Sequence, residues 1–185
     1  MAAAVELSET SPVTLDVGLV DLARQCAPAV HVVTAKALIR QESGGNPHAI
    51  GVVGGRLERQ PRSHGEALAT ARALEAGGWN YSVGLAQINR ANFARLGLTA
   101  ESAFDPCTNL RAMQVVLHEC WARARARPEG TDERWAVQAA LACYYSGSFA
   151  VARYSGYVDS VVANARSVRT ALSRSVATDD APTAR

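Results

Sequence analysis

Apolar residues recur at helical spacing along most of the chain, and the segments with this spacing end at Gly, Pro or small polar residues. The pattern predicts helices over 17–25, 32–43, 65–76, 85–96, 109–125, 135–144 and 151–168. One segment differs, because two short apolar runs flank Gly54-Gly55 within 50–59, which predicts a β-hairpin. The chain is therefore predicted to be a predominantly helical α+β protein with one small β-hairpin lobe.

The two ends of the chain differ in composition from its middle. Residues 1–15 and 173–185 are small and polar, so we expect both segments to be disordered. The remaining residues, 16–172, have the length and hydrophobic content of one globular domain, and no internal repeat or linker divides them.

Charge and composition exclude several classes of function. The 185 residues carry a net charge of only +2, which is too small to indicate a nucleic-acid partner. Arg123, Arg125 and Arg127 form a basic cluster, but their spacing by two spreads them around a helix, as is typical of a solvated helix end. No apolar run approaches the length of a transmembrane segment. The first residues lack the basic start and apolar stretch of a secretory signal.

The four cysteines leave the redox state open. They are Cys26, Cys107, Cys120 and Cys143, and no CxxC pair or other zinc-like spacing occurs among them. One or two disulfides would indicate an oxidising compartment, whereas four buried thiols would suit the cytosol. Three pairings are possible, and the spacing does not choose among them.

Glu42 is the residue with the most informative setting. It ends a predicted helix, shares a face with Leu38 and Ile39, and is followed at once by Ser43-Gly44-Gly45. Burial at the edge of that apolar face would raise the pKa of the carboxyl and keep it protonated near neutral pH. A glycosidase needs such an acid to protonate its leaving oxygen. The alternative is a glutamate that ends a helix and faces water.

Two further polar patches lie at predicted helix ends. In the first, Gly84 lets a ligand or another backbone approach closely, and the Gln87 amide suits a sugar hydroxyl or N-acetyl group. In the second, Tyr144 and Tyr145 combine an apolar ring with a hydroxyl that can donate to a carboxylate or a substrate. Tyr144 taken alone would be read as a core tyrosine.

Taken together and in this order, the motifs resemble the soluble lytic transglycosylase domain family, which has a lysozyme-like fold. The likeness is particularly to the VirB-type transglycosylases of type IV secretion systems, and it covers about 18–155. The segments that carry it are 42–52, 81–89, 104–110 and 143–147. Each motif is short, but four motifs in the same order are specific.

The resemblance implies that Glu42 is a single catalytic acid and base. It would protonate the glycosidic oxygen between N-acetylmuramic acid and N-acetylglucosamine in peptidoglycan, and then take the proton of the muramoyl C6 hydroxyl as a 1,6-anhydro ring closes. The substrate's own N-acetyl group can stabilise the charge at C1, so no second carboxylate is needed. Of the three polar patches at predicted helix ends, only the one at Glu42 contains an acid, which favours this route. The alternatives are a muramidase, in which water attacks, and a glycan-binding scaffold that has lost catalysis.

The resemblance also assigns the remaining site residues. Gln87 would bind sugar, Gly84 would allow close backbone approach, and Tyr144 would hydrogen-bond the catalytic carboxyl. Ser82 would contact the N-acetyl group. Asn89 and Tyr145 depart from the family pattern, because many relatives have Met and Asn there; we include both as substrate-binding residues.

Compartment, partners and cross-links follow from the same resemblance. It implies a Cys26–Cys107 disulfide, which leaves the other two cysteines to pair or stay free. It implies a periplasmic protein that needs no metal or other cofactor and whose partners are peptidoglycan glycan strands and components of a type IV secretion system. The 51–80 segment is longer than in the parent family, which suggests a lid or a partner surface.

Overall fold

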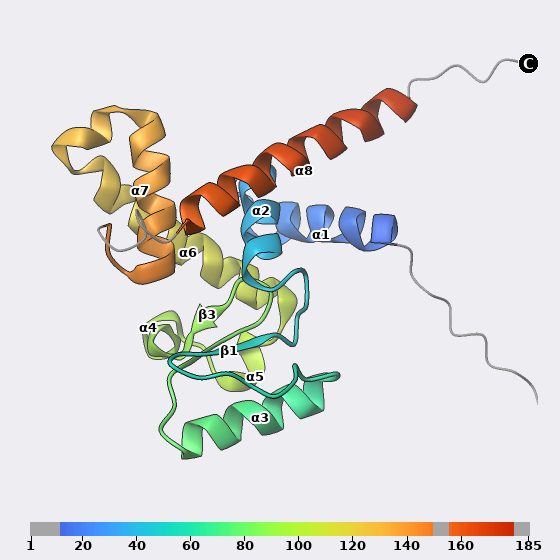
Figure 1. The fold of residues 1–185 in the computed structure, drawn as a ribbon, viewed down its shortest axis with the longest axis vertical. Helices are drawn as coiled ribbons and strands as arrows, with labels where there is room; N and C mark the ends of the chain where they lie inside the picture. Colours follow the sequence, from blue (N-terminus) through green and yellow to red (C-terminus); the bar gives the residue numbers. More distant parts are fainter. Residues whose placement is uncertain (1–11, 150–155, 180–185) are drawn as a thin grey trace, which may run out of the picture.

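Helices form most of the molecule, and a small sheet lies to one side of them (Figure 1). The structure, a computed structural model, describes residues 12–149 and 156–179, with side chains from 18 to 149 and from 156 to 174. The elements are α1 (Pro12–Cys26), α2 (Val32–Glu42), β1 (Ile50–Val52), α3 (His64–Ala76), β2 (Tyr81–Val83), β3 (Ile88–Asn89), η1 (Arg90–Asn92), α4 (Phe93–Leu96), α5 (Ala100–Ala103), α6 (Pro106–Arg125), η2 (Pro128–Thr131), α7 (Glu133–Ser146) and α8 (Tyr157–Asp179). The predominantly helical α+β class is confirmed.

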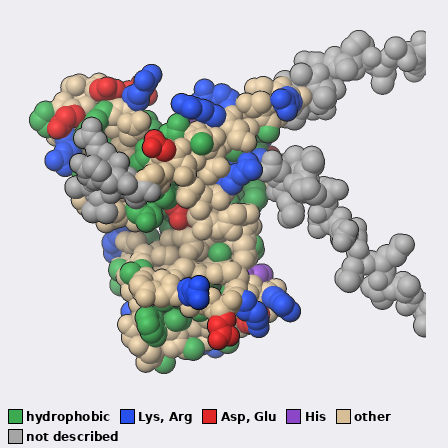
Figure 2. All heavy atoms as spheres, viewed as in Figure 1, with side chains coloured by type: hydrophobic (Ala, Val, Ile, Leu, Met, Phe, Trp, Pro, Cys, Tyr) green, Lys and Arg blue, Asp and Glu red, His purple; other side chains and the backbone are tan. Residues whose placement is uncertain are grey.

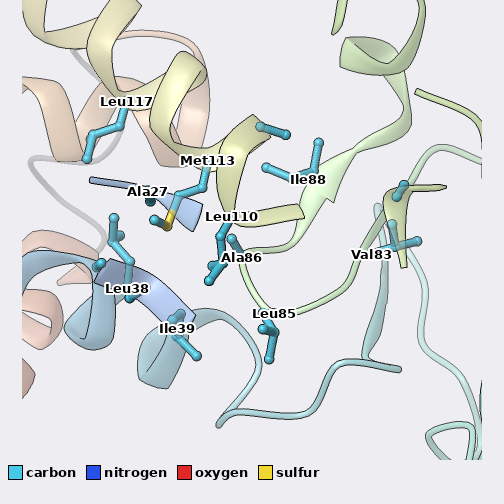
Figure 3. Packing of buried hydrophobic residues seen from close by; sticks show 14 of the residues in the cluster. Ala27, Leu38, Ile39, Val83, Leu85, Ala86, Ile88, Leu110, Met113 and Leu117 are labelled. Atoms are coloured by element: carbon cyan, nitrogen blue, oxygen red, sulfur yellow. The ribbon is translucent and has the colours of Figure 1, made fainter. Parts of the chain in front are cut away.

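The core forms where α2 meets α6. Figure 3 shows Leu38 and Ile39 of α2 near Leu110 and Met113 of α6, and all four side chains are buried. Helix α6 begins at Pro106, earlier than predicted, because the Asp105 carboxylate accepts a hydrogen bond from the Thr108 N–H at 2.8 Å and caps its first turn. Burial of α2 up to its last turn fixes the place where Glu42 leaves the core.

The sheet does not form as predicted. Strand β1 pairs antiparallel with β2, with Ile50 opposite Val83, and β2 pairs with β3. The chain does turn at Gly54, where φ is 72°, but the residues after it leave the sheet. The Gln60 side chain covers the edge of β1 instead, because its amide accepts from the Ile50 N–H at 2.8 Å and donates to the Ile50 carbonyl oxygen at 2.9 Å. The predicted 50–59 hairpin is therefore wrong: a side-chain amide takes the place of its second strand.

The predicted helix over 85–96 is wrong in its first half. Gln87 has a φ of 48°, in the left-handed region, and the chain then forms β3. Helical structure begins only at η1, where Asn89 Oδ1 accepts a hydrogen bond from the Ala91 N–H at 3.0 Å. It continues as α4 and ends at Gly97, whose φ of 65° stops the helix as the sequence predicts.

The segment over 51–80 is an ordered part of this lobe. Ser63 accepts a hydrogen bond from the Glu66 N–H at 3.3 Å and starts α3, as its capping pattern indicates. Helix α3 buries Ala67 and Ala71 and contacts α5, so it packs on the lobe that carries the sheet (Figure 1).

Helical structure extends further toward both ends than the composition predicts. Helix α1 begins at Pro12, inside the segment expected to be disordered, and residues 1–11 lie outside the described residues. Helix α8 packs along α2 and runs to Asp179, past the predicted boundary at 173. The predicted helix start at 151 falls outside the described residues, as do 180–185. Among the helices that the structure describes, none has the length and apolar character needed to cross a membrane.

All four cysteines form disulfides. Cys26 at the end of α1 is bonded to Cys107 in the first turn of α6, as the resemblance implied. Cys120 of α6 is bonded to Cys143 of α7, which settles the pair that the sequence left open. The second bond ties together the two helices that form one wall of the cleft described below.

Candidate active site

A cleft of about 1010 Å³ lies between the sheet lobe and the wall formed by α6 and α7. Figure 2 shows the surface hollowed between these two parts. The predicted site residues that line the cleft are Glu42, Ser82, Gln87, Asn89, Tyr144 and Tyr145. Residues that lie more than 100 positions apart along the chain are thus brought to one cavity, whereas Gly84 is outside its lining.

The turn that follows Glu42 fixes the position of this residue at the edge of the core. The Ser43 hydroxyl donates a hydrogen bond to the Leu85 carbonyl oxygen at 2.7 Å and accepts one from the Gly45 N–H at 3.1 Å. These bonds tie the end of α2 to the chain beside β2. Burial raises the pKa of the Glu42 carboxyl to about 7, although a hydrogen bond from Tyr157 acts in the opposite direction. The carboxyl therefore keeps its proton in roughly half of the molecules near neutral pH.

Tyr157, not Tyr144, donates a hydrogen bond to the Glu42 carboxyl. The Tyr144 hydroxyl donates instead to the Ala86 carbonyl oxygen at 2.6 Å, which corrects the role that the resemblance gave it. A hydroxyl has one proton to donate, so this bond uses the proton of Tyr144. Burial and the nearby Glu42 carboxylate raise the pKa of Tyr144, so its hydroxyl stays protonated. Tyr144 therefore fixes the 84–87 turn against α7 and lines the cleft.

Sequence reasoning missed Tyr157, which begins α8. Its ring stacks on Tyr145 with a centroid separation of 4.4 Å, while Tyr145 itself remains 54% exposed. A signal was available, because Tyr157 lies four positions before Val161 and 11 before Val168, both buried, and so shares the buried face of α8. A buried tyrosine hydroxyl normally has a hydrogen-bond partner.

The side-chain N–H groups of Gln87 donate hydrogen bonds to other parts of the protein. Its Nε2 donates to the Ala49 and Gly84 carbonyl oxygens, both at 3.1 Å. Its Oε1 lies against Gly51, where an added Cβ would come within 2.7 Å of that oxygen. The amide therefore holds the β1–β2 end of the lobe together, and it is the oxygen that remains available as an acceptor for a sugar.

The close approach that Gly84 allows in the structure is that of Asn109. The φ of Gly84 is 79°, and a Cβ at this position would lie 2.4 Å from Asn109 Nδ2. The fully buried Asn109 side chain accepts from the Ala86 N–H at 2.8 Å and donates to the carbonyl oxygens of Val83 and Ala103. Asn109 belongs to the 104–110 motif, but the sequence analysis assigned it no individual role. It shapes the turn that carries Gln87.

Ser82 and Asn89 face each other across the β2–β3 pair. Asn89 Nδ2 donates to Ser82 Oγ at 3.1 Å, and both residues line the cleft. The departure from Met at position 89 therefore creates a polar pair on the sheet side of the cleft. Such a pair suits the amide and hydroxyl groups of a sugar.

A second carboxylate also lines the cleft. Glu119 of α6 accepts a hydrogen bond from Arg95 of α4 at 2.8 Å, and both residues are lining residues. The sequence analysis did not identify this acid. Glu119 carries no motif signal, and only the fold brings it to the cleft. Among the described residues, no group of three or more His, Cys, Asp or Glu side chains is placed to hold a metal ion.

Comparisons by sequence relate this chain to known proteins. The model of a family described as "Transglycosylase SLT domain" matches residues 22–166. The chain is 52% identical over 128 residues to "Type IV secretion system protein virB1" of Brucella abortus biovar 1, a match that covers 69% of this chain and 53% of the relative. It is 34% identical over 143 residues to "Protein virB1" of Agrobacterium fabrum, covering 76% of this chain and 56% of the relative. The chain thus spans about half the length of these relatives. No solved structure gives a significant match.

Proposed function

The chain belongs to the transglycosylase SLT domain family, and on that premise we propose that it is a lytic transglycosylase that cleaves the β-1,4 bond between N-acetylmuramic acid and N-acetylglucosamine in peptidoglycan. The observation that carries the proposal is Glu42 itself. It is a buried carboxyl with a pKa of about 7 at the wall of a long cleft, and Tyr157 donates a hydrogen bond to it. Such a group can give a proton and take one back near neutral pH.

The first step uses Glu42 as an acid. The protonated carboxyl donates to the glycosidic oxygen, the bond from C1 to that oxygen breaks, and the leaving sugar departs as an alcohol. Positive charge develops at C1 of the muramoyl residue, and the N-acetyl oxygen of the same residue stabilises it. Glu42 is then a carboxylate, and the hydrogen bond from Tyr157 stabilises that form.

The second step uses the same carboxylate as a base. Glu42 removes the proton of the muramoyl C6 hydroxyl, and the C6 oxygen bonds to C1 to close a 1,6-anhydro ring. The proton lost in the first step is recovered, so no water is consumed and Glu42 returns to its starting form. Tyr157 keeps the carboxylate in place between the two steps, because its own pKa is raised by burial and by the Glu42 charge, so it remains a donor.

The names of the relatives support a role for this activity in a larger assembly. The Brucella relative is named as a type IV secretion system protein. We infer that this chain opens the cell wall locally for such a system, with peptidoglycan strands and secretion components as its partners. Two disulfides favour an oxidising compartment, which for a peptidoglycan enzyme is the periplasm.

Glu119 raises the question of a hydrolytic route. A muramidase would use a second carboxylate to activate water or to attack C1. Arg95 already pairs with Glu119 at 2.8 Å, so this carboxylate is engaged in an ion pair. The anhydro route therefore remains the better-supported mechanism.

The test is a digest of purified peptidoglycan analysed by mass spectrometry. Wild-type protein should release products that end in anhydro-muramic acid, and Glu42→Gln should lower turnover by about 10²- to 10⁴-fold. Glu119→Gln serves as the matched carboxylate control and should retain anhydro products. Reducing ends without anhydro-muramic acid would identify a muramidase. Equal turnover by the wild type and Glu42→Gln would remove Glu42 as the catalyst, and glycan binding without products would indicate a scaffold.

A further inference from the structure

The charged side chains on the cleft wall do not cancel while Glu42 is protonated. Within the described residues, those that line the cleft are Glu42, Arg95, Glu119 and Arg123. Arg95 and Glu119 neutralise each other through their ion pair. Glu42 exchanges its proton during the reaction. The guanidinium of Arg123 is the charge that remains facing the substrate.

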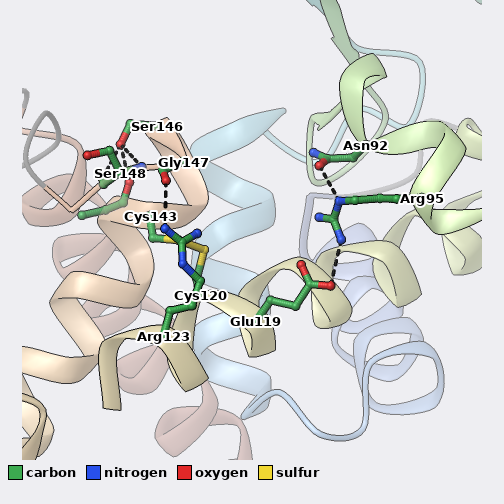
Figure 4. Close-up of a disulfide and its surroundings, with 10 residues drawn as sticks. Asn92, Arg95, Glu119, Cys120, Arg123, Cys143, Ser146, Gly147 and Ser148 are labelled. Carbon is green, nitrogen blue, oxygen red and sulfur yellow. Dashed lines mark hydrogen bonds and ion pairs between the residues drawn. A yellow bond between two sulfur atoms is a disulfide. The ribbon is translucent and has the colours of Figure 1, made fainter. Parts of the chain in front are cut away.

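Arg123 differs from the other arginines that form salt bridges in the described part of the chain. Those arginines each meet a carboxylate; they are Arg24, Arg59, Arg72, Arg90 and Arg95. Arg123 instead lies near two neutral acceptors at long range, the Gly147 carbonyl oxygen at 3.4 Å and Cys143 Sγ at 3.5 Å (Figure 4). No carboxylate among the described residues pairs with it. A guanidinium has five N–H donors, so most of them remain for a ligand.

The guanidinium is nevertheless held in a defined position. It lies over the Phe149 ring at 5.4 Å from the ring centroid, and its two weak hydrogen bonds fix it beside the Cys120–Cys143 disulfide. Its side chain is exposed to solvent. A cation that is positioned by a ring and by backbone, and is left without an anion, is ready to bind one.

Arg123 is also close to the reacting end of the cleft. Its two contacts, Cys143 and Gly147, flank the segment that carries Tyr144 and Tyr145. Tyr145 stacks on Tyr157, whose hydroxyl binds Glu42. Arg123 and Glu42 thus line the same cleft and are linked through the 143–147 segment and Tyr157.

We propose that Arg123 binds a carboxylate attached to the muramoyl residue of the substrate and so makes the cleft selective for muramic-acid glycan over neutral N-acetylglucosamine glycan. The inference rests on the proposed function. The 3-O-lactyl group distinguishes muramic acid from N-acetylglucosamine, and it carries either its own free carboxylate or a peptide with further carboxylates. Both sources present the same chemistry to a guanidinium fork, which pairs with carboxylates in a bidentate manner.

A purely structural role is the competing explanation. By contacting the Gly147 carbonyl oxygen, Arg123 could serve only to hold the end of α7. That role would affect every glycan alike. Discrimination between charged and neutral glycans is therefore the decisive readout.

The experiment measures glycan binding to Glu42→Gln protein, with and without Arg123→Gln, by calorimetry. The probes are an N-acetylglucosamine oligomer, a peptide-free glycan with free lactyl carboxylates, and the same glycan with peptide stems. We expect Arg123→Gln to weaken binding of the carboxylate-bearing glycans by about tenfold and of the neutral oligomer by less than about twofold. A loss confined to the peptide-free glycan assigns the lactyl carboxylate, because that carboxyl is an uncharged amide in the peptide-bearing glycan. A loss confined to the peptide-bearing glycan assigns a peptide carboxylate, and a loss on both shows that Arg123 binds either carboxylate.

Two further variants complete the design. Arg127→Gln removes the same charge from a neighbouring arginine that also lies over Phe149 but does not line the cleft, so it should leave all three affinities unchanged. Arg123→Lys keeps the positive charge but lacks the forked guanidinium group. It should therefore retain part of the discrimination between carboxylate-bearing and neutral glycans. Equal losses on all three glycans, or no loss on any, would overturn the inference while leaving the proposed function intact. Failure of the Glu42→Gln protein to bind any glycan would instead overturn the proposed function and this inference with it.

Discussion

The hydroxyl of Tyr157 donates a hydrogen bond to Oε1 of Glu42, which joins the first residue of α8 to the last residue of α2 across 115 positions of sequence. The bond opposes the effect of burial, because burial favours the protonated carboxyl and the hydrogen bond favours the carboxylate. The balance leaves the pKa of Glu42 at about 7. A residue that must act as acid and then as base needs such a balance.

Replacing Tyr157 with Phe should disturb that balance in a predictable direction. Loss of the hydrogen bond leaves burial unopposed, so the pKa of Glu42 should rise. The acid form would then persist to higher pH, and the alkaline limb of the rate profile should move upward. Turnover at its optimum should fall by about tenfold, because the carboxylate formed in the first step loses a donor. A pH–rate profile on peptidoglycan measures both effects.

Tyr145→Phe is the matched control for this change. Tyr145 stacks on Tyr157 at 4.4 Å, so the substitution removes a hydroxyl from the same aromatic pair without touching the bond to Glu42. The alkaline limb of the pH–rate profile of Tyr145→Phe should lie at the same pH as that of the wild type. A limb that stays fixed or moves downward in Tyr157→Phe would refute the assignment of Tyr157 as the partner of the carboxyl.

The raised pKa of Glu42 also predicts how stability depends on pH. The folded protein holds this proton up to about pH 7, whereas the unfolded chain releases it near the ordinary value of 4.5. The unfolded state therefore binds fewer protons between these values, and the wild type should lose stability as pH rises through them. This pKa difference corresponds to about 3 kcal/mol of unfolding free energy. The Glu42→Gln protein should not show this loss. Urea denaturation of both proteins at pH 4 and pH 8 measures this; parallel losses in the two proteins would contradict it.

The sequence identified Glu42 and missed Tyr157 for a physical reason. Glu42 lies beside Leu38 and Ile39 on one helix face and before a Gly-rich turn, so its setting is local and can be read from neighbours. Tyr157 acquires its role only when α8 packs along α2. The same holds for Glu119, which enters the cleft because α4 and α6 meet there.

Errors in the predicted sheet have a similar origin. The Gly54-Gly55 turn was read from local sequence, and the chain does turn there. The partner of β1 is β2, which lies about 30 positions further along, and the near edge is taken by the Gln60 amide. Turn signals report where the chain reverses but not which backbone it meets afterwards. The helix end at Gly97 was more predictable because a cap acts within one turn, whereas the Asp105 cap starts α6 before the predicted start at 109.

Gly84→Ala should be among the more damaging single substitutions in the site. A Cβ there would lie 2.4 Å from Asn109 Nδ2 and would disrupt the three hydrogen bonds that this amide makes. Gly97→Ala is the matched control, since Gly97 has a similar φ of 65° and nothing within 4 Å of an added Cβ. We expect a cost of about 1 kcal/mol at Gly97 and about 3 kcal/mol at Gly84 in chemical denaturation. Similar costs at both positions would show that the Asn109 contact does not constrain this turn.

The two disulfides should separate stability from activity. Cys26–Cys107 closes a loop with a sequence separation of 81, and Cys120–Cys143 one of 23. Chain-entropy loss in the unfolded state predicts that removing the first by paired Cys→Ser substitution costs about 4.5 kcal/mol and the second about 3.5 kcal/mol.

Only the second pair lines the cleft, where it ties α6 to the helix that carries Tyr144. The Cys120/Cys143 variant should therefore lose more turnover at a temperature where both variants are folded, although it loses less stability. A larger loss of turnover in the Cys26/Cys107 variant would show that α1, and not the α6–α7 wall, controls the geometry of the cleft.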